Sequence, residues 1–133
     1  MERSLERLVR QRAHNACEYC RIAQRDDDLT FEIDHIIAST HGGHSVASNL
    51  ALSCFWCNRY KGTNLAGIDP LTGRHTKLFH PRRHSWSRHF EWDGPRLIGR
   101  TAIGRATIRV LSINHPLRVR LRSELFHEGR FPT

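Results

Sequence analysis

The order of apolar and polar residues predicts a helix and then a strand in the first third of the chain. Apolar residues recur at three- and four-residue spacing between charged neighbours in the first segment: Leu5, Leu8, Val9, Ala13 and Ala16. This spacing predicts an amphipathic helix over residues 2–16. Leu29, Phe31 and Ile33 alternate with polar residues, which is the period of a half-buried strand. On that period Asp34 faces away from the core.

The segment that follows predicts a small unit of strand, loop, strand and helix. Residues 36–48 mix Ser, Thr, His and Gly and are expected to form a loop, in which Gly42 and Gly43 permit positive φ. Residues 49–53 can return as a second short strand, and residues 57–65 are expected to form a helix. These pieces are too small to fold alone, so a bound metal would supply folding energy to the unit.

The middle of the chain is expected to contain a linker and a hairpin. Residues 68–87 have three turn-like clusters and no clear period, which indicates an ordered linker that wraps the domain. Residues 88–100 predict a β-hairpin with its turn at Asp93 and Gly94.

Two helices are expected to close the chain, over residues 104–113 and 116–127. Asn114 is expected near a cap position of the second helix, and Pro116 in its first turn. We expect residues 1–67 to form one functional motif and residues 68–133 to form a basic extension that packs on the same domain.

Length and hydropathy favour a single soluble domain. The chain has 133 residues, which is a single-domain length. No apolar run approaches the ~20 residues that cross a bilayer, and the first residues contain no apolar stretch that could serve as a signal peptide. We therefore expect a cytoplasmic protein with no membrane partner.

The positive charge is concentrated in the second half. The net charge is +8, yet residues 1–73 hold 8 Lys and Arg against 9 Asp and Glu, whereas residues 74–133 hold 13 against 4. A polyanionic partner such as nucleic acid is the natural inference, because each neutralised phosphate releases condensed counterions. The alternative is a basic protein whose arginines only maintain solubility.

The four cysteines form two Cys-x-x-Cys pairs, Cys17 with Cys20 and Cys54 with Cys57. Disulfides are not expected, because the cytosol keeps thiols reduced. Two such pairs, with 33 residues between the inner cysteines, suit a single tetrahedral metal ion. The alternatives are a thiol redox protein and four unrelated core thiols.

Asp34 and His35 place an acid beside an imidazole at the end of the predicted strand. Hydrolysis of a phosphodiester needs a water stripped of its proton and positive charge beside the phosphate oxygens. An imidazole titrates near neutral pH and can take that proton, while a carboxylate can bind a hard divalent cation such as Mg²⁺. Adjacent strand residues point to opposite faces, so the strand must break locally for both groups to reach one phosphate.

Over residues 17–62 the chain resembles the HNH endonuclease family. The matching residues are Cys17-Glu18-Tyr19-Cys20, Asp34-His35-Ile36-Ile37, Gly42-Gly43, Asn49-Leu50 and the run from Cys54 to Gly62. The resemblance implies an α+β fold: a zinc-stabilised ββα-metal motif with an N-terminal helix and a basic C-terminal extension of a hairpin plus helices. It also implies endonuclease activity, with Zn²⁺ as a structural cofactor and Mg²⁺ or Mn²⁺ as the catalytic one.

Carried over by position, the resemblance implies roles for four residues. His35 is expected to be the general base and Asp34 a metal ligand. Asn49 is expected to brace the loop and help orient the histidine. Asn58 falls where the family has His or Asn and is expected to be the second protein ligand of the catalytic metal; the alternative is an amide that caps backbone groups after Cys57.

Double-stranded DNA is the expected partner, and five basic residues are the expected phosphate contacts: Arg59, Lys61, Arg82, Arg83 and Arg88. The aromatic residues Trp86, Phe90 and Trp92 are expected in the core rather than stacked on bases. The alternative for the whole chain is a zinc-ribbon-like protein that binds nucleic acid without cutting it.

Overall fold

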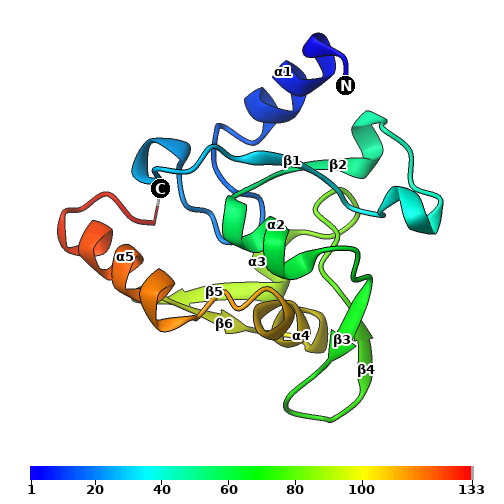
Figure 1. The fold of residues 1–133 in the computed structure, drawn as a ribbon. Helices are drawn as coiled ribbons and strands as arrows, with labels where there is room; N and C mark the ends of the chain where they lie inside the picture. The colour runs from blue at the N-terminus through cyan, green and yellow to red at the C-terminus, as the bar shows by residue number, and fades with distance from the viewer. Residues whose placement is uncertain (133) are drawn as a thin grey trace.

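The computed structural model describes residues 1–132, which contain five α-helices and six β-strands (Figure 1). The helices are α1 (Arg3–Arg12), α2 (Phe55–Lys61), α3 (Trp86–His89), α4 (Ala102–Val110) and α5 (Pro116–His127). The strands are β1 (Glu32–His35), β2 (Leu50–Ser53), β3 (Ala66–Ile68), β4 (His75–Lys77), β5 (Phe90–Asp93) and β6 (Arg96–Gly99). They pair as three antiparallel hairpins, β1 with β2, β3 with β4 and β5 with β6. The α+β fold class is therefore confirmed.

The first hairpin and α2 form the expected ββα unit. β1 pairs with β2 so that Asp34 lies opposite Ala51 and His35 opposite Leu50. All four residues of β2 are buried, because the hairpin is covered on both faces. Two short 3₁₀ turns, η2 (Ser39–His41) and η3 (Ala47–Asn49), give the loop between the strands its shape.

The expectation that Asp34 faces away from the core is wrong. Its side chain is 4% exposed, whereas Leu29, which the alternation places on the buried face, is 41% exposed. The reason is tertiary: α2 and Tyr19 cover the Asp34 face of β1, and Lys61 of α2 supplies a counter-charge there. A strand covered on both sides does not follow the half-buried alternation.

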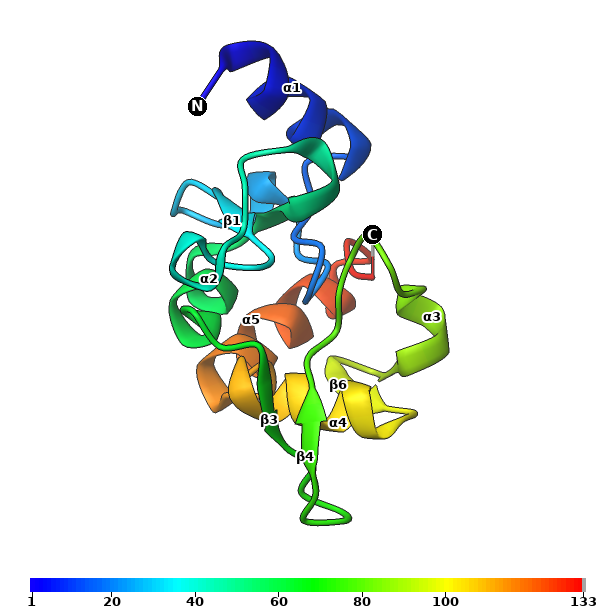
Figure 2. The same ribbon diagram turned by 90° about the vertical axis from the view of Figure 1, so that its right-hand side faces the viewer.

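Most of residues 68–87 lacks regular structure, as expected of an ordered linker, but the segment also contains a strand and the start of a helix that the sequence pattern did not predict. The β3–β4 hairpin begins just before it, at Ala66, and its connecting loop extends beyond the body of the molecule; α3 follows at Trp86 (Figure 2). β3 packs on α4, where Gly67 lies so close to Val110 that a Cβ would come within 2.4 Å of its side chain. The strands have three residues each and carry polar or exposed side chains, so no apolar period marked them. The proposed division between residues 67 and 68 falls inside β3.

The last hairpin and the last two helices form near their predicted positions. Asp93 pairs with Arg96, so the turn between β5 and β6 has two residues. Asn114 lies next to the N-cap of α5, as expected, but its side chain does not cap the helix. Its side-chain amide bonds the backbone of Leu97 in β6, and the Nδ1 atom of His115 accepts the capping hydrogen bond.

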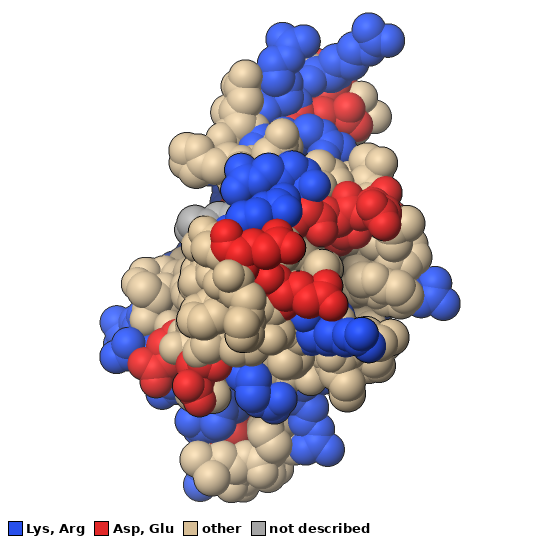
Figure 3. All heavy atoms as spheres, turned by 90° about the vertical axis from the view of Figure 1, so that its left-hand side faces the viewer, with Lys and Arg blue, Asp and Glu red and all other residues tan. Residues whose placement is uncertain are grey.

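Charges of both signs share the face that carries α5. Seen from that side, Lys and Arg side chains lie next to Asp and Glu side chains (Figure 3). Arg120 pairs with Glu124 at 3.6 Å, and Arg130 pairs with Glu128 and with Asp26. The basic second half therefore does not make this face uniformly positive.

The buried apolar residues form one cluster that runs from Val9 to Phe131 and draws on both halves of the chain. Phe90 is 1% exposed, and Trp86 and Trp92 pack against the cluster at its edge, as expected. Among the helices of residues 1–132, none combines the length and apolarity needed to cross a bilayer.

Candidate functional site

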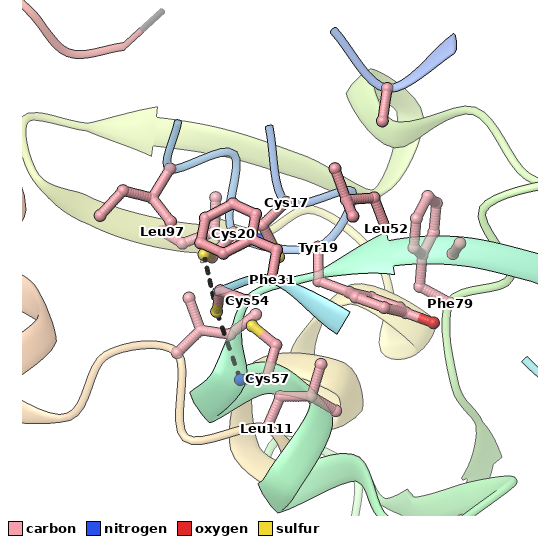
Figure 4. Packing of buried hydrophobic residues seen from close by; sticks show 14 of the residues in the cluster. Cys17, Tyr19, Cys20, Phe31, Leu52, Cys54, Cys57, Phe79, Leu97 and Leu111 are labelled. Carbon is pink, nitrogen blue, oxygen red and sulfur yellow. Dashed lines mark hydrogen bonds between the residues drawn. The ribbon is translucent and has the colours of Figure 1, made fainter. Parts of the chain in front are cut away.

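The four cysteine side chains meet in one buried cluster. Their Sγ atoms all lie within 4.8 Å of one another, and the sulfur atoms of Cys20 and Cys54 are 3.8 Å apart (Figure 4). Tetrahedral coordination at a Zn–S distance of about 2.3 Å requires sulfur atoms to lie about 3.8 Å apart. The cluster therefore fits a structural zinc ion, and the predicted convergence of two Cys-x-x-Cys pairs is confirmed.

Each pair is shaped by its own backbone. The N–H of Cys20 points at Cys17 Sγ at 3.5 Å, and the N–H of Cys57 points at Cys54 Sγ at 3.4 Å. The second bond makes Cys54 the N-cap of α2. Two matching turns thus present both sulfur atoms of each pair toward the same point.

A cation from the C-terminal helix lies against the thiols. Arg118 of α5 donates from Nη2 to Cys57 Sγ at 2.8 Å and from Nη1 to the carbonyl of Leu111 at 2.8 Å. With zinc bound, the tetrathiolate site would carry net negative charge, and the half-buried guanidinium beside it would offset that charge. The contact also attaches α5 to the metal cluster.

His35 ends β1 with its ring half-buried. Its Nε2 atom lies 2.7 Å from Ser45 Oγ, across the loop that joins β1 to β2. Within residues 1–132, Nδ1 has no hydrogen-bond partner. If Nε2–H donates to the serine, the lone pair on Nδ1 is available to accept a proton.

Asn49 braces that loop through its side-chain amide. Its Oδ1 accepts from the N–H of Ile37 at 2.9 Å, and its Nδ2 donates to the carbonyls of Ile37 and His44 at 3.0 and 2.9 Å. These bonds join the first residues after His35 to the residue before Ser45. The amide of Asn49 thus holds the loop between His35 and Ser45 at both ends.

Asp34 lies in a buried hydrogen-bonded network. The Tyr19 hydroxyl donates to Oδ2 at 2.7 Å, and Lys61 Nζ lies 3.2 Å from Oδ1. Burial raises the pKa of Asp34, and the neighbouring ammonium and hydroxyl oppose that rise only in part. Burial also raises the pKa of Tyr19, so that its hydroxyl stays protonated as a donor.

Comparison with known proteins identifies the family of this segment. Residues 17–64 match the model of the family described as HNH endonuclease. We refer to this matched segment, residues 17–64, as the HNH domain. Neither the search of curated proteins nor the search of solved structures gave a match. The match over residues 17–64 supports membership of this segment in a nuclease family.

On α2 of the HNH domain, Asn58 faces a carboxylate that the sequence did not single out. Its Nδ2 donates to Glu32 Oε2, and its Oδ1 has no hydrogen-bond partner within the described residues. The described hydrogen bond of the Asn58 amide goes to the Glu32 carboxylate and not to the backbone after Cys57. Glu32 and Asp34 are two residues apart on β1 and lie on its α2 side, so the strand period could have indicated Glu32.

The expected phosphate contacts of the HNH domain and its extension separate into exposed and internal residues. Arg59, Arg83 and Arg88 are exposed. Lys61 is 2% exposed and bonds Asp34 and two backbone carbonyls, so it does not reach the surface where DNA would pass. Arg82 pairs with the buried Glu18, and its side chain is 19% exposed.

Sequence reasoning missed three side chains that hold the HNH domain together at this point: Tyr19, Ser45 and Arg118. Tyr19 lies between the first two cysteines, and that position could have indicated that it faces the metal motif. No spacing signal pointed to Ser45 or Arg118, because each contact joins segments brought together only by the fold.

Proposed function

We propose that this protein is a metal-dependent endonuclease that hydrolyses phosphodiester bonds in DNA. The observation that carries the proposal is an HNH domain in which His35 is half-buried, oriented by Ser45, and has an unpartnered Nδ1. The zinc cluster has only a structural role in this proposal, because its cysteines hold the hairpin and α2 together.

In this proposal His35 is the general base. The Nε2–H group donates to Ser45 Oγ and selects the tautomer with a lone pair on Nδ1. Nδ1 then removes a proton from the water that attacks phosphorus. Asn49 keeps this geometry, because its amide fixes the loop between His35 and Ser45 at both ends.

The proposed ligands of a catalytic Mg²⁺ or Mn²⁺ are Asp34 and Asn58. The free Oδ1 of Asn58 fits such an ion. Each Asp34 oxygen accepts one hydrogen bond and retains a further lone pair, although its carboxylate is almost fully covered. Glu32 lies beside Asn58 and adds an exposed carboxylate at the same point. When bound, a divalent cation would supply positive charge beside the phosphate oxygens.

The test is cleavage of plasmid DNA with added Mn²⁺ or Mg²⁺ by the zinc-loaded protein. His35→Ala should abolish cleavage and leave zinc content and melting temperature unchanged. His75→Ala, an exposed histidine on β4, is the matched control and should cut normally. Undiminished cleavage by His35→Ala would refute the role of His35.

A second candidate, a zinc-ribbon-like protein that binds nucleic acid without cutting it, is favoured by one observation. Asp34, an expected metal ligand, is buried and already paired with Lys61 and Tyr19. Such a protein would bind DNA in the presence of Mn²⁺ without cleaving it. A chelator of Mn²⁺ would leave this result unchanged.

A further inference from the structure

A pocket of about 220 Å³ lies beside the loop that follows His35. One wall comes from the HNH domain, at Ile36, Ile37 and Lys61. The other comes from β4 and the segment after it, which passes the HNH domain (Figure 2). This second wall includes Lys77, His80, Arg83 and His84.

Two histidines of the pocket have their tautomers set by the backbone. The N–H of His80 donates to Nδ1 of His84 at 2.9 Å, and the N–H groups of Arg82 and Arg83 donate to Nδ1 of His80 at 3.2 Å. A nitrogen that accepts a hydrogen bond carries no proton, so each neutral ring is protonated at Nε2. Within residues 1–132 neither Nε2 has a hydrogen-bond partner, so both rings keep a free N–H donor.

The charged residues that line the pocket are all cations. Lys77 and Arg83 are exposed, and neither has an ion-pair partner among the described residues. The third cation, Lys61, is engaged with Asp34. No Asp or Glu belongs to the lining. Burial and the nearby Arg83 lower the pKa of His80 to about 4, so this ring is neutral at physiological pH and acts as a donor only.

These properties favour an anion over a metal ion. A metal ligand needs an unprotonated ring nitrogen, yet Nδ1 of each histidine is occupied by the backbone and Nε2 carries the proton. Two unpaired cations would also repel a metal. The volume is below the ~300–1,000 Å³ of pockets for drug-sized ligands, so the fitting anion is a small group such as a phosphate.

We propose that this pocket binds a backbone phosphate of the nucleic-acid strand, next to the phosphate at His35. Lys77 and Arg83 provide charge, and the Nε2–H groups of His80 and His84 provide directed donors. The inference rests on the proposed function, since it takes the strand at His35 as the ligand. The extension thus contributes to substrate binding at a defined place rather than through its net charge.

The proposal is tested by binding, without cutting. In a His35→Ala background and without added divalent metal, fluorescence anisotropy measures the affinity of a labelled duplex at several salt concentrations. Lys77→Gln/Arg83→Gln should weaken binding about tenfold at low salt and reduce the slope of log K against log salt by roughly 1 to 2. The matched control is Arg3→Gln/Arg7→Gln on α1, which should keep the slope.

A second measurement tests the donors directly. In ¹⁵N NMR of the zinc-loaded protein, titration with a short oligonucleotide should shift the Nε2 signals of His80 and His84 more than that of His75. Titration with inorganic phosphate at equal concentration shows whether the pocket prefers a free anion, and a larger shift with free phosphate would overturn the assignment to backbone phosphate. An unchanged salt slope for the double variant would also overturn it. Neither result depends on whether His35→Ala abolishes cleavage.

Discussion

Lys61→Met tests the buried network at the end of β1. The Lys61 and Asp34 side chains are 3% and 4% exposed, with Nζ 3.2 Å from Oδ1. Nζ also lies 3.3 Å from the carbonyl of His35 and 3.1 Å from that of Ile36. Methionine fills similar space but leaves the Asp34 carboxylate buried without a counter-charge.

Removing one partner of a buried ion pair costs about 3–5 kcal/mol. Domains of this kind are stable by only about 5–15 kcal/mol, so the variant should lose a large fraction of its free energy of unfolding. Urea unfolding of the zinc-loaded protein, followed by circular dichroism, measures the loss. Arg59→Met, which removes an exposed cation from the same helix, is the control and should change stability by less than about 0.5 kcal/mol.

The loss of unfolding free energy caused by Lys61→Met should depend on Asp34 and on pH. In Asp34→Asn/Lys61→Met neither charge of this pair remains, so the double variant should be more stable than the sum of the single losses by about 2–3 kcal/mol. Without Lys61 the pKa of Asp34 should rise further above its unfolded value. The folded state then binds the extra proton, so the deficit should shrink as the pH falls. A Lys61→Met variant that matches wild type, or a double variant with additive losses, would refute the network.

Three further outcomes are expected. Cys17→Ser should abolish stoichiometric zinc binding and the cooperative melting transition, and an unchanged melting temperature would contradict a structural zinc. Arg118→Met should weaken zinc binding roughly 10–100-fold in chelator competition, because the sulfur atoms lose a charged donor, whereas exposed Arg120→Met should not. The pKa of His80 is lowered to about 4, from about 6.5 in an unfolded chain, mainly by burial. Its contribution to stability is therefore lost as the pH falls from about 6.5 to 4. The urea midpoint of His80→Gln should therefore fall less than that of the wild-type protein over this pH range. Equal pH profiles for the two proteins would show that His80 does not titrate as described.

Sequence periodicity predicted the elements whose stability depends on one apolar stripe or on a turn. A helix forms within the predicted range 2–16, although it ends at Arg12, and the hairpin around Asp93 and Gly94 forms as well, because both patterns reflect the surface that they bury. The β3–β4 hairpin could not be predicted in this way. Its strands are held by backbone pairing and by the close approach of Gly67 to Val110, and neither leaves an apolar period.

At the candidate site, spacing predicted which residues converge when they lie on one element or bind one metal. It could not predict their partners. Tyr19 and Lys61 lie 15 and 27 residues from Asp34, and a buried lysine is rare enough that an exposed role was the natural expectation. The charge balance of the two halves likewise indicated a basic extension but not the pocket at His80 and His84.

One face of α2 connects the metal cluster to the site. Cys54 at the N-cap is followed at three, four and seven residues by Cys57, Asn58 and Lys61, which is the spacing of a single helical stripe. The stripe passes from two thiols to the amide beside Glu32 and then to the ammonium that holds the end of β1. The helix has only seven residues and would not be stable alone. Loss of zinc should therefore release Asn58 and Lys61 together, and with Lys61 the hydrogen bond to the carbonyl of His35 at the end of β1.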